Sequence, residues 1–178
     1  MARISYRLLP LPIFVLVVSL LFYQSAGLNS EGQYLLDIKS RIGDTYNHLS
    51  NWNPNDSTPC GWKGVDCTSD YNPVVWCLDL SSMNLSGSLS PSLGGLAKLP
   101  VELARLSCLT ALNIANNRIS GPFPDQIGNL SSLSLLIAYS NNITGPLPAT
   151  LGNLKRLRTF RAGQNLISGS FTFGDWWM

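Results

Sequence analysis

From Leu109 onward, apolar and polar positions follow a pattern that repeats with a period of twenty-four positions. Segments opening at Leu109, Leu133 and Leu157 share the pattern L-x-x-L-x-L-x-x-N-x-I-x-G-x-L-P-x-x-I-G-N-L-x-x. The alternating L-x-L predicts a short strand with one buried and one solvent-facing side. Glycine and proline recur in phase with the leucines, which argues against chance leucine periodicity in a helical bundle. We therefore expect an α/β solenoid with a short parallel sheet on its concave side, because one coil cannot bury its apolar face alone.

An asparagine follows the strand in each of these segments, at Asn117, Asn141 and Asn165. A buried amide side chain can bond the backbone groups of neighbouring coils, which would otherwise lack partners. We expect these three side chains to form a ladder, one above another.

The spacing slips before Leu109. An earlier repeat opens near Leu78 and carries Met83 at the ladder position, but the step from Gly87 to Gly121 exceeds the period by ten positions. Leu99 matches the first position of a repeat, whereas the next residue, Pro100, matches a position in the second half of one. Fourteen positions of the repeat pattern, including its strand, therefore have no counterpart between these two residues. We expect a short helix or irregular turn over residues 100–106. We also expect the repeat stack, and with it the concave sheet, to be interrupted near residues 97–108.

Residues 1–27 have the layout of a secretory signal peptide: a basic start, an apolar run from Leu8 to Phe22, and small residues before Gly27. An uncleaved anchor is the alternative, although the run is short for a bilayer span. The whole chain has 12 basic and 10 acidic residues. Cleavage after Gly27 removes Arg3 and Arg7 and leaves a net charge of zero, which gives no support to nucleic-acid binding. The cleaved chain would not span a membrane.

Secretion would expose the chain to oxidation and glycosylation. Four Asn-x-Ser/Thr sequons point to an extracellular or apoplastic location, at Asn55, Asn84, Asn129 and Asn142.

The segment before the repeats is predicted to form a cap. Ser30-x-x-Gln33 resembles a capping box, and the apolar spacing that follows predicts an amphipathic helix over residues 30–42. Trp52 and Trp62 add aromatic bulk suited to covering the open end of a solenoid.

Four cysteines occur, and Cys60 and Cys67 lie seven positions apart in a loop that an oxidising compartment would close. A zinc site is disfavoured because no C-x-x-C pair is present and His48 is the only histidine. Cys77 and Cys108 fall at different phases of the repeat, so we expect free thiols. No other cofactor is indicated.

The motifs S-E-G-Q-Y-L-L-D-I-K, L-S-N-W-N, P-C-G-W-K-G-V-D-C and L-D-L-S-S-M-N-L-S-G resemble the N-terminal cap and first repeat of plant leucine-rich-repeat receptor-like kinases. The resemblance covers nearly all of residues 28–171. It implies a disulfide between Cys60 and Cys67 and an extracellular domain that reads peptides or steroids. In that family a transmembrane helix and a cytoplasmic Ser/Thr kinase follow, with the full-length relatives in the plasma membrane. This chain shows no second apolar span and no kinase signature, so we expect a truncated, non-enzymatic relative.

The expected organisation has eight parts. They are a signal peptide (1–27), a plant-type cap (28–73), a first repeat (74–99), a partial repeat without a strand (100–108), two full repeats (109–132 and 133–156), an incomplete last repeat (157–171) and a non-repeat tail (172–178).

The expected function is recognition of a peptide or protein ligand, or a co-receptor, through the concave face. The candidate contact residues are Asp79, Asn113, Ile137, Tyr139 and Arg161. Tyr139 and Arg161 are the strongest candidates because Tyr and Arg are common in binding hot spots. The basic run from Lys155 to Arg158 precedes the strand and is interpreted as a solvated rim. Two alternatives are a secreted inhibitor of cell-wall hydrolases, like the polygalacturonase inhibitors, and a non-functional truncated product.

Overall fold

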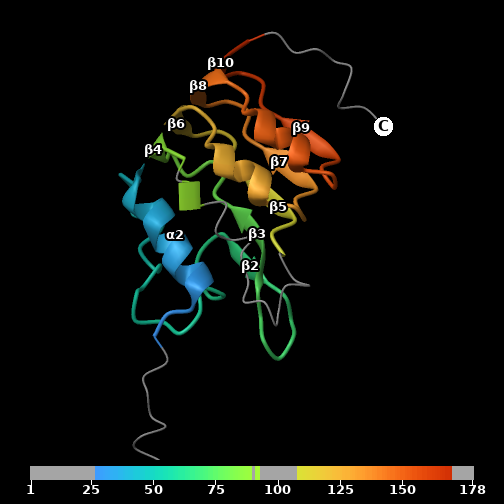
Figure 1. The fold of residues 1–178 in the computed structure, drawn as a ribbon. Helices are drawn as coiled ribbons and strands as arrows, with labels where there is room; N and C mark the ends of the chain where they lie inside the picture. The colour runs from blue at the N-terminus through green and yellow to red at the C-terminus, as the bar shows by residue number, and fades with distance from the viewer. Residues whose placement is uncertain (1–26, 90, 93–107, 170–178) are drawn as a thin grey trace, which may run out of the picture.

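The computed structural model describes residues 27–89, 91–92 and 108–169, which wind into stacked coils with two sheets along their sides (Figure 1). The helices that lie wholly within the described residues are α2 (Ser30–Ser40) and the 3₁₀ helices η3 (Asp125–Asn129) and η4 (Ala149–Asn153). The strands are β1 (Ile42–Gly43), β2 (Val65–Cys67), β3 (Val75–Asp79), β4 (Ser86–Ser88), β5 (Ala111–Asn113), β6 (Arg118–Gly121), β7 (Leu135–Ile137), β8 (Asn142–Pro146), β9 (Thr159–Arg161) and β10 (Leu166–Ser168).

One sheet, here called the concave-side sheet, has the order β2-β3-β5-β7-β9. Its strands β3, β5, β7 and β9 run parallel, and their register places Leu78, Leu112, Leu136 and Phe160 in one column. The three leucines of this column are fully buried. The strands β5, β7 and β9 each begin two positions after the leucine that opens their repeat. The expected solenoid, with one coil per period of the sequence, is therefore confirmed.

A second sheet, here called the lateral sheet, has the order β1-β4-β6-β8-β10. The helices η3 and η4 lie side by side and close the coils on a third side. Side chains from all three sides fill the space between them, among them Ile119 from the lateral sheet, Ile127 from η3 and Leu136 from the concave-side sheet. The core is therefore a continuous apolar column along the stack.

The expected interruption of the sheet near residues 97–108 is wrong. Strand β3 pairs directly with β5, with Cys77 opposite Ala111 and Asp79 opposite Asn113. The lateral sheet is equally continuous, because β4 pairs with β6. The reason is that strand pairing depends on backbone hydrogen bonds between neighbouring coils, not on the length of chain that joins them. The longer step in sequence between Leu78 and Leu112 therefore leaves no gap between the paired strands. The helix or turn expected at 100–106 lies outside the described residues.

The cap helix begins at Ser30 as expected, but its capping residue and its C-terminal end differ from expectation. The N-cap of α2 is Asn29, whose side-chain oxygen accepts a hydrogen bond from the Gly32 amide at 2.9 Å. The capping box proposed for Ser30 and Gln33 is therefore wrong by one residue at its start. The helix ends at Ser40 instead of residue 42 because Ile42 and Gly43 form β1, which pairs with β4.

The cap closes the first coil on both sheets. Strand β1 pairs antiparallel with β4, and β2 pairs antiparallel with β3. Each sheet thus ends on a cap strand, which covers the edge that a parallel stack would leave open. Trp52 and Trp62 stack with ring centroids 5.3 Å apart and are 2 % and 3 % exposed. Together with α2 they seal the apolar end of the solenoid.

Within the described residues, no helix has the length and apolar character needed to cross a bilayer. The segment expected to be a signal peptide, apart from Gly27, and the expected non-repeat tail at 172–178 lie outside the described residues.

Candidate functional site

A ladder of asparagines holds the concave-side strands in place. The Asn141 oxygen accepts the Ile119 amide at 3.0 Å, and its side-chain nitrogen donates to the carbonyls of Ile114, Ala138 and Tyr139 at 2.9, 3.2 and 3.3 Å. Asn117 and Asn165 repeat this arrangement one coil earlier and one coil later. The turn after each strand is therefore fixed by bonds to the preceding coil, which makes the concave face rigid.

Two of the candidate contact residues are engaged in the fold. Asp79 accepts the amide of Ser81 at 2.9 Å, and Asn113 accepts the amide of Ala115 at 3.1 Å. Each side chain thus caps the turn that follows its own strand, as Asx residues often do. Asn113 also donates to Asp79 at 3.3 Å, which links the two coils. These bonds occupy part of the polar capacity that a ligand would use.

The other three candidates lie together on the next two coils. Ile137 and Tyr139 are half-buried on the coil of β7, and Arg161 is exposed at the end of β9. The register places Ile137 directly beside Arg161. The Tyr139 hydroxyl accepts a hydrogen bond from Asn116 at 3.3 Å. Among the described residues, no hydrogen bond or ion pair is found for the Arg161 side chain. An apolar side chain, a phenol and a guanidinium are thus presented side by side.

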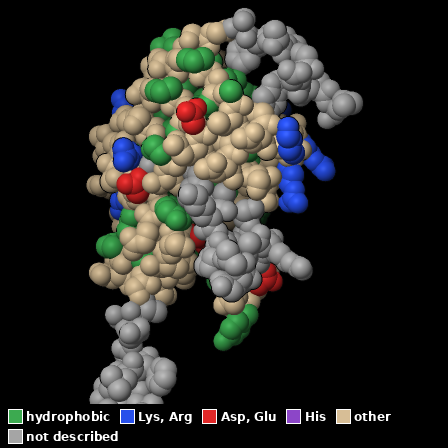
Figure 2. Space-filling view, viewed as in Figure 1, with side chains coloured by type: hydrophobic (Ala, Val, Ile, Leu, Met, Phe, Trp, Pro, Cys, Tyr) green, Lys and Arg blue, Asp and Glu red, His purple; other side chains and the backbone are tan. Residues whose placement is uncertain are grey.

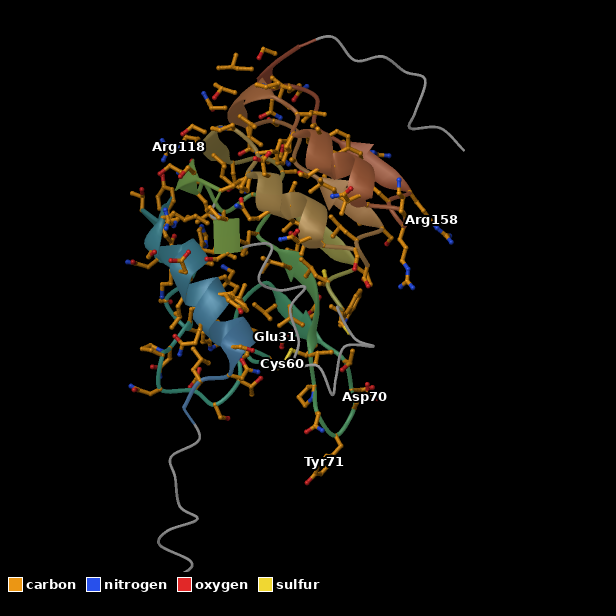
Figure 3. All side chains as sticks on the ribbon, in the orientation of Figure 1. Glu31, Cys60, Asp70, Tyr71, Arg118 and Arg158 are labelled. Atoms are coloured by element: carbon orange, nitrogen blue, oxygen red, sulfur yellow. A yellow bond between two sulfur atoms is a disulfide. The ribbon has the colours of Figure 1, made fainter. Side chains whose placement is uncertain are left out.

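Basic side chains gather on one edge of the molecule (Figure 2), where Arg158 projects outward (Figure 3). Lys155, Arg156 and Arg158 are exposed and precede β9, so they lie at the rim of the concave-side sheet and not within it.

Sequence reasoning missed two exposed aromatic residues near the cap. Trp76, at the start of β3, is 41 % exposed. Tyr71 is fully exposed and extends from the loop between β2 and β3, pointing away from the body of the molecule (Figure 3). A signal was available for Trp76: it occupies the repeat position that polar residues fill in the later coils, namely Thr110, Ser134 and Arg158.

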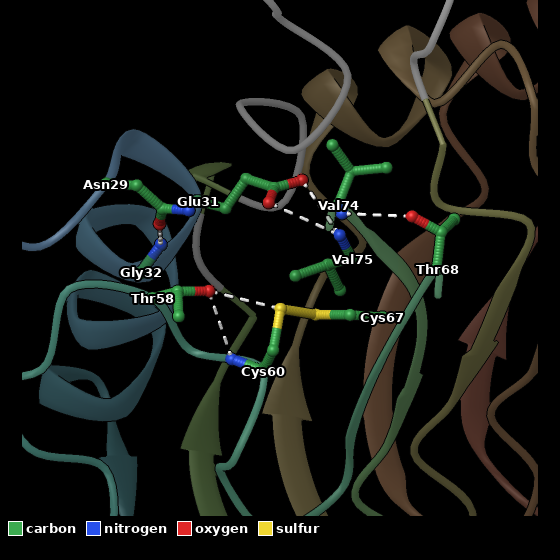
Figure 4. The surroundings of a disulfide bond; sticks show 9 residues. All are labelled: Asn29, Glu31, Gly32, Thr58, Cys60, Cys67, Thr68, Val74 and Val75. Atoms are coloured by element: carbon green, nitrogen blue, oxygen red, sulfur yellow. Dashed lines mark hydrogen bonds between the residues drawn. A yellow bond between two sulfur atoms is a disulfide. The ribbon is translucent and has the colours of Figure 1, made fainter. Parts of the chain in front are cut away.

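The cap contains the disulfide and a buried carboxylate (Figure 4). Cys60 and Cys67 are joined with their Cα atoms 5.5 Å apart, and the Thr58 hydroxyl donates to the Cys60 sulfur at 3.1 Å. Glu31, in the first turn of α2, is 5 % exposed, and its two oxygens accept the Val75 amide at 3.1 and 3.3 Å. Burial raises the pKa of the Glu31 carboxyl, and the bond from Val75 opposes part of that shift.

The remaining cysteines are free thiols. Burial and the nearby Asp66 carboxylate raise the pKa of Cys77 to about 11. Burial, followed by the charge of Glu31, raises the pKa of Cys108. Both thiols are therefore protonated, and weakly nucleophilic, at neutral pH. No group of three His, Cys, Asp or Glu side chains in the described part of the chain could hold a metal ion.

The four sequons differ in accessibility. Asn55, Asn129 and Asn142 are exposed, whereas Asn84 is half-buried and adopts a φ of 53°.

Comparison with known protein families gives two matches. A family described as the leucine rich repeat N-terminal domain matches residues 28–68, and the leucine rich repeat family matches residues 108–130. The chain folds as a leucine-rich-repeat solenoid, and its cap and one of its coils match these two families. The first match falls on the cap and the second on the coil that carries β5 and β6.

Its relatives are plant receptor kinases. A probable leucine-rich repeat receptor-like protein kinase of Arabidopsis thaliana is 56 % identical over 85 residues, which are 47 % of this chain and 8 % of the relative. A crystal structure of PEPR1 with AtPEP1 gives a TM-score of 0.66 at 28 % identity, with 80 % of this chain and 19 % of that chain covered. The ectodomain of the receptor kinase GASSHO1/SCHENGEN3 from Arabidopsis thaliana, in complex with CASPARIAN STRIP INTEGRITY FACTOR 2, gives a TM-score of 0.64 at 33 % sequence identity. That alignment covers 76 % of this chain and 15 % of the ectodomain. This chain thus spans a small part of each.

Proposed function

We propose that this leucine-rich-repeat chain is a non-catalytic recognition module at the cell exterior. It binds a peptide or protein ligand, or a co-receptor, through the concave-side sheet. The observation that carries the proposal is the adjacent placement of Ile137, Tyr139 and Arg161 on two coils. The similar PEPR1 and GASSHO1/SCHENGEN3 structures, each in complex with a partner, support the same interpretation.

The three side chains have the chemistry of a binding surface. Ile137 offers apolar area, Tyr139 offers a ring with a polar tip, and Arg161 offers up to five donors in a fixed plane. The asparagine ladder fixes the backbone beneath them, so little conformational entropy remains to be lost on binding. Asp79 and Asn113 are weaker contributors because their oxygens already cap turns.

Selection of a random-peptide phage library on the secreted, glycosylated chain tests the proposal. Affinity of the selected peptides is then measured for Tyr139→Ala and Arg161→Ala. We expect each change to weaken binding by about tenfold or more, as truncation of hot-spot residues does. Arg118→Ala is the matched control, because Arg118 is an exposed cation on β6 of the lateral sheet. Failure to select any peptide, or equal losses for Arg118→Ala and Arg161→Ala, would reject the concave-side site.

A further inference from the structure

A hollow of about 600 Å³ opens at the edge of the concave-side sheet, where the chain enters β7 and β9. Its polar lining consists of three hydroxyl residues and three cations, Thr110, Ser132, Ser134, Lys155, Arg156 and Arg158. The hollow lies outside the surface formed by Ile137, Tyr139 and Arg161, because its lining residues precede the strands. None of the function proposed above uses it.

The described lining of the hollow is positively charged. Lys155, Arg156 and Arg158 are all exposed, and no carboxylate is among the described residues that line the hollow. Within the described residues, none of the three cationic side chains forms an ion pair or a hydrogen bond. Figure 2 shows Lys and Arg side chains gathered on this edge. Three cations so close together in the sequence, around a recess, favour a ligand that carries several negative charges.

Two hydroxyl groups in the lining of the hollow leave acceptor atoms available. The Thr110 hydroxyl donates to the Trp76 carbonyl at 3.2 Å, and the Ser134 hydroxyl donates to the Thr110 carbonyl at 3.0 Å. Each hydroxyl has thus used its single hydrogen, and its oxygen lone pairs can still accept from a ligand. A ligand rich in hydroxyl donors fits this lining.

The row is regular and ends on an aromatic ring. Trp76, Thr110, Ser134 and Arg158 occupy the same position on successive coils, as the backbone bonds from Thr110 to Trp76 at 2.8 Å and from Arg158 to Ser134 at 2.9 Å show. Neighbouring strands are spaced by about 4.8 Å. The exposed Trp76 indole therefore lies three steps from the guanidinium end of the row.

We infer that this row binds an acidic oligosaccharide, namely an oligomer of uronic acids. Its carboxylates can pair with the cations clustered between Lys155 and Arg158, its hydroxyls can donate to the oxygens of Thr110 and Ser134, and a sugar ring can stack on Trp76. An acidic peptide fits less well, because Leu157 is the single apolar residue among the described lining and it is half-buried. The hollow thus lacks the apolar pockets into which peptide side chains anchor.

Titration calorimetry with three probes tests this inference on the secreted chain. The probes are an oligogalacturonate, the same oligomer with its carboxylates methyl-esterified, and an oligoglutamate of equal charge. We expect binding of the oligogalacturonate that weakens as salt rises from about 0.05 to about 0.5 M, because screening reduces exposed attractions. We expect no binding of the ester and weaker binding of the oligoglutamate.

Single-charge variants locate the site. Arg158→Gln should weaken oligogalacturonate binding about two- to fivefold, as expected for one exposed ion pair. Trp76→Ala should weaken it without changing its salt dependence. Arg118→Gln is the charge-matched control, since Arg118 and Arg158 project from opposite sides of the molecule (Figure 3). Equal binding of the ester, tighter binding of the oligoglutamate, or equal effects of Arg118→Gln and Arg158→Gln would each overturn the inference.

Discussion

At the scale of single residues, the ladder shows how one side chain can satisfy several backbone groups. Asn141 is 8 % exposed and bonds one amide and three carbonyls on two coils. The first coil places Met83 at this position, also 8 % exposed. No preceding repeat coil stands there, because the cap strands take its place, so an apolar side chain suffices. The ladder is needed only where one coil stacks on another.

Asn141→Ala should lower the free energy of unfolding by about 2 to 4 kcal/mol, since it leaves buried backbone groups without partners. Asn165→Ala, one coil later, should cost about 1 kcal/mol, because Asn165 is only half-buried and water can replace its bonds. Urea unfolding followed by circular dichroism measures both. Equal decreases in the free energy of unfolding for the two variants would show that the energetic contribution of a ladder asparagine does not depend on its burial.

Glu31 makes a second prediction at this scale, on pH. Because burial raises its pKa in the folded state, protonation of Glu31 favours folding. That contribution is fully present below the pKa of the unfolded carboxyl, about 4.3, and is lost as pH rises through the higher folded pKa. Glu31→Gln keeps an acceptor for the Val75 amide and removes the charge. It should stabilise the protein at pH 7 and reduce the change in stability between pH 4.5 and 7.

Urea unfolding across that pH range checks this expectation. Asp70→Asn is the control, because Asp70 is exposed in the loop between β2 and β3 (Figure 3). A lower free energy of unfolding for Glu31→Gln at pH 7 would contradict this expectation. That result would mean that the hydrogen bond from the Val75 amide stabilises the carboxylate by more than its burial destabilises it.

At the scale of elements, equivalent glycines in η3 and η4 have different surroundings. A Cβ atom on Gly128 would clash with the backbone and side chain of Thr150 in the next coil, whereas a Cβ on Gly152 meets no described atom within 4 Å. Gly128→Ala should therefore cost about 1 to 3 kcal/mol. Gly152→Ala should be neutral, or stabilise by up to about 1 kcal/mol through the unfolded chain. Urea unfolding measures the stability of both variants. Similar free energies of unfolding for Gly128→Ala and Gly152→Ala would contradict the close packing of η3 against the next coil.

The elements also show what sequence could and could not predict. The period fixes which residues of β5, β7 and β9 are buried, so these strands, the ladder positions and the outward candidates follow from the pattern. The N-cap residue of α2 does not, because Asn29 and Ser30 are adjacent and both can cap a helix. Asn29 caps it in a tertiary setting, in which its own amide also bonds the Ser57 carbonyl at 3.1 Å. Likewise, the hollow before β9 combines residues from three coils, and no single repeat displays it.

At the scale of the whole molecule, the solenoid tolerates a coil of unequal length. The residues that join Ser92 to Cys108 lie outside the described structure, yet β3 and β5 pair in the same parallel arrangement as β5 and β7. The spacing of the repeats along the sequence therefore predicts a gap in the sheet, whereas the strands of neighbouring coils pair without one. The stability of the stack depends on the coil interfaces and only weakly on the length of each connection.

This view makes a prediction about deletion. Removing residues 99–108 brings the step from β3 to β5 back to the period of the later coils while keeping both strands. We expect a folded protein whose free energy of unfolding changes by about 1 kcal/mol or less, because shortening one connection alters the closure entropy only slightly. Removing the equally long segment 120–129 instead takes away half of β6 and all of η3, which carries the buried Ile127, and should abolish cooperative unfolding. Circular dichroism and urea unfolding distinguish the two. A 99–108 deletion that fails to fold would show that the long connection supports the stack, since neither inner strand would have been lost.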